Sequence, residues 1–110
     1  MTVRDTTQIF TPKLEDVKLF QTIPTKLHYR YMHNYPNSFT GKEAVAFMKK
    51  VFNVSNENAI QFGNKLLQAE VILPATHRFN TTFSDKNKFI YTLNVTGSNF
   101  KNSIYIHFEY

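Results

Sequence analysis

The 110-residue sequence predicts a single α+β domain in which three helices are closed by a small antiparallel sheet. In three separate segments apolar residues recur at three- and four-residue steps, which is the period of amphipathic helices. After the first of these segments and again near the C-terminus, apolar and polar residues alternate, which is the period of strands. The resulting order is helix, arm strand, two helices, short strand and C-terminal β-hairpin. This order is typical of a winged-helix-like domain with a β arm between helices 1 and 2.

The size and composition of the chain allow one hydrophobic core. Hydrophobic residues make up 42% of the sequence, and eleven of its residues are Phe, so the chain should fold as a globular domain. We divide it into an N-terminal arm at residues 1–13, the domain itself at residues 14–94 and a C-terminal strand extension at residues 95–110.

The first helix and the strand after it have different periods. Leu14, Val17 and Phe20 recur at helical spacing, with acidic residues in the first turn, and Pro24 should end this helix. Residues 26–32 then alternate as a strand does. Its aromatic or apolar members are Leu27, Tyr29 and Tyr31, and its basic members are Lys26, His28 and Arg30. We therefore expect one aromatic face and one cationic face, with the positive charge turned outward.

The second helix has the clearest local start signal. Pro36-Asn37 indicates a turn, and Thr40 followed by Glu43 is a capping box in which each side chain bonds the other's backbone N–H. Phe39 is placed to pack onto the first helical turn, and the helix should begin at Gly41. Its predicted buried residues are Ala44, Val45, Phe47, Met48, Val51 and Phe52.

A third helix should follow the break at Asn53-Val54, with Ser55 or Asn56 as its cap. Its predicted buried residues are Ala59, Ile60, Gly63, Leu66 and Leu67. Glycine destabilises a helix interior by about 1 kcal/mol, so another element should pack closely against Gly63.

The C-terminal part is predicted to be β structure. Residues 71–73 suit a brief buried strand before Pro74. Residues 78–83 and 88–93 flank a polar four-residue turn and predict a β-hairpin. Alternation in residues 104–110 predicts a last strand, whose exposed edge would be able to pair across a dimer.

Enzymatic chemistry has no support in the sequence, and we expect no catalytic residues, metal or cofactor. The four histidines lie on separate predicted elements, with no carboxylate at metal-binding spacing on one helix face. Glu43 is explained by its capping role. Thr40-Gly41-Lys42 lacks the upstream glycine with which a phosphate loop wraps its ligand.

The net charge of +5 favours acidic partners: anionic lipid headgroups, phosphopeptides, acidic protein tails or nucleic acid. The candidate lipid- or receptor-binding residues are Lys26, His28, Arg30, Lys42, Arg78, Lys86 and Lys88. The alternative for the arm is a cationic strand face that is solvated and binds no partner. Lys49 and Lys50 lie where they would complement the helix dipole. Without cysteine, a signal pattern or a membrane-spanning stretch, the chain is expected to be cytoplasmic.

Several segments, in order, resemble the DEP domain family, found in Dishevelled, pleckstrin and regulators of G-protein signalling. They are HYRY at residues 28–31, YPNSFTGKEAV at 35–45, GNKLL at 63–67, TFSD at 82–85 and FIY at 89–91. The chain departs from many members at Ala46-Phe47-Met48, where they often carry Trp. The resemblance implies a non-catalytic signalling module that brings a larger multidomain GTPase regulator to the inner face of the plasma membrane. Its partner would be anionic lipid or an acidic receptor tail.

Two other functions are kept as alternatives. A winged-helix domain with positive charge can bind nucleic acid. The segment of the third helix carries the basic Lys65 but also the acidic Glu57 and Glu70, so it is poorly suited to binding in the major groove. Only its amides, at Asn58, Gln61, Asn64 and Gln68, would be able to contact bases. The second alternative is an intramolecular packing domain of a GTPase regulator.

Overall fold

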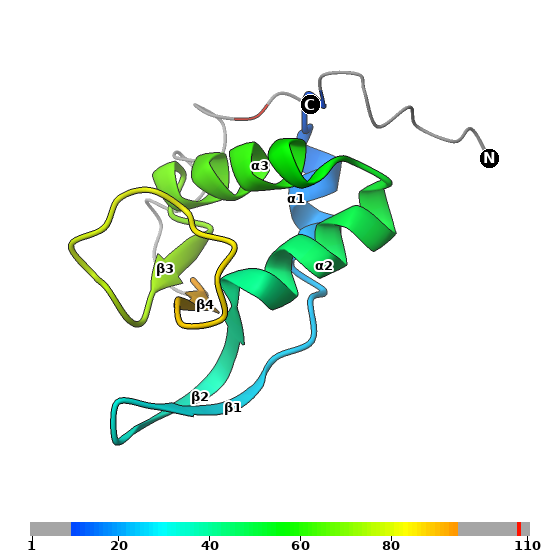
Figure 1. The fold of residues 1–110 in the computed structure, drawn as a ribbon. Coiled ribbons are helices and arrows are strands. Elements are labelled where there is room, and N and C mark those ends of the chain that lie inside the picture. The colour runs from blue at the N-terminus through cyan, green and yellow to red at the C-terminus, as the bar shows by residue number, and fades with distance from the viewer. Residues whose placement is uncertain (1–9, 95–107, 109–110) are drawn as a thin grey trace.

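The structure is a computed structural model that describes residues 10–94 and Phe108. Its elements in chain order are α1 (Leu14–Phe20), β1 (Lys26–Arg30), β2 (His33–Thr40), α2 (Gly41–Phe52), α3 (Asn56–Gln68), β3 (Ile72–Pro74) and β4 (Ile90–Leu93). The three helices lie together at one end, and β1 and β2 project from the other as a two-stranded arm (Figure 1). The predicted α+β, winged-helix-like class is confirmed.

The four strands form one antiparallel sheet in the order β1-β2-β4-β3. The C-terminal half of β2 pairs with β4, from Ser38↔Thr92 to Thr40↔Ile90, whereas its N-terminal half continues outward and pairs with β1. Tyr31 and Met32 connect β1 to β2, and both have positive φ, 54° and 59°. This conformation matches the twist of a two-residue hairpin. The arm is therefore an extension of the sheet.

The predicted turn at Pro36-Asn37 is wrong, because both residues lie inside β2. The register changes there: Lys26 pairs with Ser38, but His28 pairs with Tyr35. Asn37 has a φ of 53°, and the extra residue on β2 forms a bulge. Proline and asparagine are tolerated at bulges for the same backbone reasons that place them in turns.

Both predicted helix caps are confirmed. Thr40 Oγ1 accepts the Glu43 N–H at 3.0 Å, and Glu43 Oε1 accepts the Thr40 N–H at 2.9 Å. Ser55 Oγ accepts the N–H of Asn58 at 3.1 Å and caps α3. The first helix begins at Leu14, as predicted, but it ends at Phe20, four residues before Pro24.

The buried faces of α2 and α3 agree with the sequence except at a few positions. Val51 is exposed and Phe47 is only partly buried, while Phe62, which the sequence pattern missed, is fully buried. Gly63 lies directly beneath the Phe83 ring, and a Cβ at Gly63 would lie 2.4 Å from its Cδ2 atom. The close approach expected at Gly63 is therefore confirmed.

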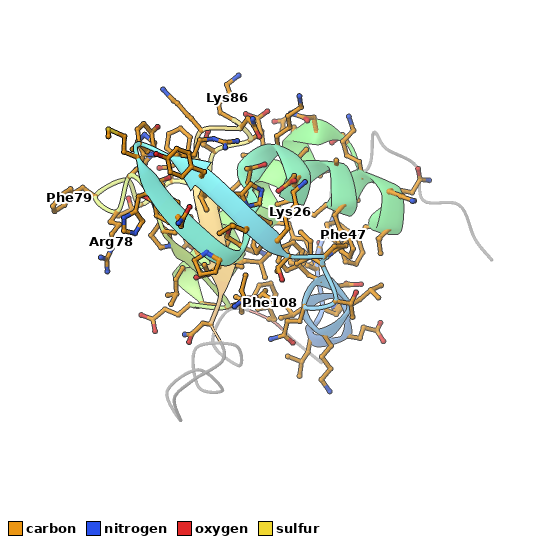
Figure 2. All side chains as sticks on the ribbon, turned by 90° about the horizontal axis from the view of Figure 1, so that it is seen from below. Lys26, Phe47, Arg78, Phe79, Lys86 and Phe108 are labelled. Atoms are coloured by element: carbon orange, nitrogen blue, oxygen red, sulfur yellow. The ribbon has the colours of Figure 1, made fainter. Side chains whose placement is uncertain are left out.

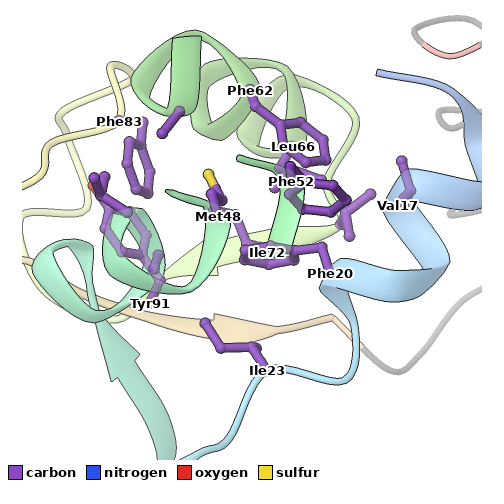
Figure 3. Close-up of a cluster of buried hydrophobic side chains, with 14 of the residues drawn as sticks. Val17, Phe20, Ile23, Met48, Phe52, Phe62, Leu66, Ile72, Phe83 and Tyr91 are labelled. Carbon is purple, nitrogen blue, oxygen red and sulfur yellow. The ribbon is translucent and has the colours of Figure 1, made fainter. Parts of the chain in front are cut away.

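The core combines aromatic rings with aliphatic side chains, contributed by all three helices and the sheet (Figure 3). Phe20 on α1 meets Phe39 and Phe62 edge-on, with ring centroids 5.8 and 6.0 Å apart. Phe108 is also buried, and its ring centroid lies 6.1 Å from that of Phe62. The predicted last strand otherwise lies outside the described residues, as does the N-terminal arm up to residue 9.

The predicted hairpin of residues 78–83 with 88–93 is wrong. The C-terminal strand pair is β3 with β4, with Ile72↔Leu93 at one end and Pro74↔Tyr91 at the other. Residues 75–89 form a long loop without strands. From this loop Phe83 enters the core and stacks on Tyr91, with centroids 5.0 Å apart, and this packing replaces strand pairing.

Candidate functional site

A polar cluster at the base of the arm joins β1, β2 and α2. The Glu43 carboxylate contacts Nε2 of His28 and Nζ of Lys26, each at 2.9 Å, while it also accepts the Thr40 N–H. Nδ1 of His28 lies 2.8 Å from Oγ of Ser38 on the neighbouring strand. Three elements thus share one hydrogen-bond network, which fixes the arm relative to the start of α2.

The electrostatics of this cluster favour the charged form of Glu43. Burial by itself would raise the pKa of the Glu43 carboxyl group. The hydrogen bond from Thr40, the bond and charge of Lys26 and the charge of His28 outweigh that effect and hold the pKa of Glu43 below its ordinary value.

The outward cationic face expected for the arm is wrong in one essential respect. His28 is only 6% exposed and points toward α2, because alternation sets two faces but does not decide which one turns inward. Lys26 is exposed but paired with Glu43. Arg30 is partly buried and donates to the carbonyl of Tyr29 at 2.8 Å. Binding of a partner by these three residues remains a prediction.

The outer part of the arm presents apolar side chains to solvent instead. We define the tip surface as the exposed residues Tyr29, Tyr31 and Met32 of the arm together with Phe79 of the long loop. Met32 is 89% exposed and Phe79 has a relative exposure of 102%, the value of an unprotected side chain. Large apolar side chains exposed on neighbouring segments are candidates for an interaction surface.

Arm and loop are in contact through Tyr31 and His77. Their ring centroids lie 5.7 Å apart, and the Tyr31 hydroxyl lies 3.4 Å from His77 Nε2. His77 in turn stacks on Phe89 at 4.2 Å. The loop that carries Phe79 is therefore braced against the arm.

The predicted basic residues fall into separate groups. Arg78 projects beside Phe79 at one edge of the domain (Figure 2), and Lys88 is exposed on the same loop, with its Nζ 5.7 Å from the Phe89 ring centroid. Lys86 projects from a different edge (Figure 2) and lines a hollow with Lys42. The predicted cap residues Phe39, Thr40, Gly41 and Glu43 all lie at the start of α2 and serve its structure.

Sequence reasoning missed Met32 and Phe79. Met32 becomes prominent because the arm turns at Tyr31-Met32, and neither residue is a common choice for positive φ. Phe79 and Phe83 both belong to the same predicted strand, yet Phe79 is exposed and Phe83 is buried. No local signal distinguishes the two.

The described residues contain neither a metal-binding cluster nor a helix that could span a membrane. Within residues 10–94 and Phe108, no group of three or more His, Cys, Asp or Glu side chains is arranged to hold a metal ion. The helices of this part are also too short or too polar to cross a bilayer.

The part of the chain from the arm to β4 matches a known family. The family model for the domain found in Dishevelled, Egl-10, and Pleckstrin (DEP) matches residues 22–93. The chain belongs to the DEP family. DEP domains are non-catalytic signalling modules that generally take part in membrane targeting or protein interaction within larger proteins. No curated protein sequence matches this DEP domain significantly. Helix α1, Phe10 and Phe108 contribute to its core but lie outside the matched segment.

Proposed function

We propose that this DEP domain brings a larger G-protein or Rho-GTPase regulator to an anionic membrane at the cytoplasmic side, with the tip surface as the part that enters the lipid interface. The observation that carries the proposal is the exposure of Phe79 and Met32 beside tyrosine rings on a braced arm and loop. Large apolar side chains that stay exposed on a folded domain are best explained by a partner that buries them.

The magnitudes support a reversible contact. Burying a side chain such as Phe or Met away from water contributes about 1.5–3 kcal/mol. Tyrosine rings are enriched at the level of lipid headgroups, where the ring is apolar and the hydroxyl stays hydrated. Each basic residue near an anionic membrane adds about 1 kcal/mol, and Arg78 and Lys88 lie on the loop that carries Phe79. Two apolar side chains and two basic ones therefore give a weak, reversible membrane contact rather than a permanent anchor.

The rigid base of the arm strengthens the proposal. Because Glu43 and Ser38 hold His28, the arm is set in one direction relative to the helices. A pre-organised arm loses less conformational entropy on binding than a mobile loop does.

The two rival partners are less well supported. An acidic receptor tail would need unpaired positive charge on the arm, but Lys26 is paired and His28 is buried. Nucleic acid would need free side chains on α3. The amide oxygen of Asn64 already accepts the Phe83 N–H at 2.7 Å, and Lys65 is partly buried.

Vesicle co-sedimentation tests the proposal. The protein is mixed with phosphatidylcholine vesicles, with or without phosphatidylserine, at low and moderate salt. We expect binding that requires the anionic lipid and that falls about fivefold or more in the double variant Met32→Ser/Phe79→Ser. The matched control is Leu19→Ser/Val51→Ser, which removes two partly exposed apolar side chains from α1 and α2. Equal loss in both variants, or stronger binding of duplex DNA than of vesicles, would refute the proposal.

A further inference from the structure

A second candidate site lies away from the tip surface, where α2, the start of α3 and the long loop enclose an open hollow of about 490 Å³. Three lysines line it, Lys42 and Lys49 from α2 and Lys86 from the loop. Figure 2 shows Lys86 projecting from a different edge than Arg78 and Phe79. A ligand in this hollow would therefore lie on another side of the domain from the proposed membrane contact.

The lysines are brought together by the packing of the loop onto the helix. Gly41 permits this contact, since a Cβ at its position would lie only 1.8 Å from the backbone oxygen of Ser84. The Ser84 N–H donates to the buried Tyr91 hydroxyl at 3.0 Å, and the Gly41 N–H donates to the carbonyl of Phe89 at 2.9 Å. Residues 84–89 of the loop are thus held at both ends, which places Lys86 opposite the first turns of α2.

The positive charge of the hollow is largely uncompensated. In the part of the chain that the structure describes, Lys42 and Lys49 form no ion pair. Asp85 is the single carboxylate in the lining; it lies 3.9 Å from Lys86 Nζ and accepts a hydrogen bond from Asn56 Nδ2 at 3.3 Å. Three ammonium groups and one carboxylate leave a formal charge that matches a dianion. Lysine ammonium groups are common phosphate binders.

The rest of the lining suits a peptide better than a sugar headgroup. Val45 and Ala46 supply apolar surface, on which the aliphatic carbons of flanking residues would rest. The side-chain amides of Asn56 and Asn87 also line the hollow, where they can hydrogen-bond a peptide backbone. A phosphorylated residue carries a charge of about −1.5 to −2 and three acceptor oxygens, which the lysines complement.

We propose that the hollow of Lys42, Lys49 and Lys86 binds a phosphoserine- or phosphothreonine-bearing segment of a protein partner. This goes beyond the proposed membrane contact and does not depend on it. A domain with both sites would require a lipid surface and a phosphorylated partner together, so that its targeting responds to phosphorylation.

Fluorescence anisotropy tests the inference with a labelled pool of short peptides that share a central phosphoserine and random flanking residues. The same pool with serine in place of phosphoserine is the reference. We expect the phosphorylated pool to bind at least about fivefold more tightly, and Lys42→Gln/Lys86→Gln to remove that preference. The control Lys18→Gln/Lys50→Gln removes two exposed lysines outside the hollow and should keep the preference. Asp85→Asn, which removes the only carboxylate in the lining, should strengthen binding.

The outcomes distinguish this site from the others. Equal affinity for both pools would overturn the inference, as would equal loss in the hollow and control variants. Competition by soluble inositol phosphates without any peptide preference would overturn the peptide assignment in favour of a headgroup. Because Met32→Ser/Phe79→Ser leaves the hollow intact, it should bind the phosphorylated pool normally, whatever its behaviour on vesicles.

Discussion

His28 Nε2 on the arm lies 2.9 Å from Oε1 of Glu43 in the first turn of α2. The same oxygen accepts the N–H of Thr40, and the other carboxylate oxygen pairs with Lys26. One side chain therefore caps a helix and also fixes the direction in which the arm projects. The local stability of the helix start and the presentation of the tip surface depend on the same carboxylate.

Glu43→Ala should destabilise the domain by about 2 kcal/mol, because it removes half of the capping box and leaves Nε2 of the buried His28 without its partner. Urea unfolding followed by circular dichroism measures this change. The matched control, Glu57→Ala, removes an exposed acidic residue from the first turn of α3 and should cost no more than about 0.5 kcal/mol. Hydrogen exchange at Ser38 and Thr40 should speed up in Glu43→Ala alone. A change in Glu43→Ala no larger than that in the control would contradict the role assigned to the network.

The lowered pKa of Glu43 predicts a pH dependence with a definite sign. A carboxyl group whose pKa is lower in the folded state than its ordinary 4.5 contributes stability that is present above that value. This contribution is lost as the pH falls through the folded-state pKa. The unfolding free energy of the wild type should therefore drop more steeply below pH 4.5 than that of Glu43→Gln. Parallel curves for the two proteins would show that the folded-state pKa of Glu43 is not lowered.

Gly63→Ala should destabilise the domain by about 1–3 kcal/mol, despite the higher helix propensity of alanine, because the new methyl group overlaps the Phe83 ring. The exposed neighbour substitution Gln61→Ala is the control and should be close to neutral. If the Phe83 ring is the cause, the double variant Gly63→Ala/Phe83→Leu will be destabilised by less than the sum of the two single-variant effects. Strict additivity would point to another origin.

Phe108 should matter to stability although it lies outside the segment that matches the DEP family. Phe108→Ala removes a buried ring next to Phe62 and should cost about 3 kcal/mol. Phe79→Ala removes the same side chain from a fully exposed position and should change stability by less than about 0.5 kcal/mol. Thermal unfolding of the two variants compares them directly. Similar melting temperatures would mean that Phe108 does not belong to the core.

The parts of the fold that the sequence predicted are those with local signals. The Thr40–Glu43 capping box and the Ser55 cap satisfy backbone groups within three residues, so they can be read directly. Gly63 predicted a close approach because a helix interior gives glycine no other advantage.

The parts that failed depend on long-range or unusual geometry. The β3–β4 pairing and the packing of Phe83 against α3 join residues far apart in the sequence. The arm turn uses positive φ at Tyr31 and Met32, where an Asn-Gly pair would have been recognisable. For the site, alternation showed that the arm has two faces, but the inward direction of His28 is set by Glu43 on another element.

Tryptophan fluorescence at the tip surface tests the membrane proposal most directly, because the chain contains no tryptophan of its own. Phe79→Trp and Met32→Trp each place a single reporter on the tip, and Leu19→Trp places one on α1 as the control. With phosphatidylserine-containing vesicles, we expect the emission of both tip reporters to shift to shorter wavelength while that of the control stays unchanged. Bound protein whose tip reporters keep their aqueous emission, or whose Leu19→Trp reporter shifts equally, would contradict the account.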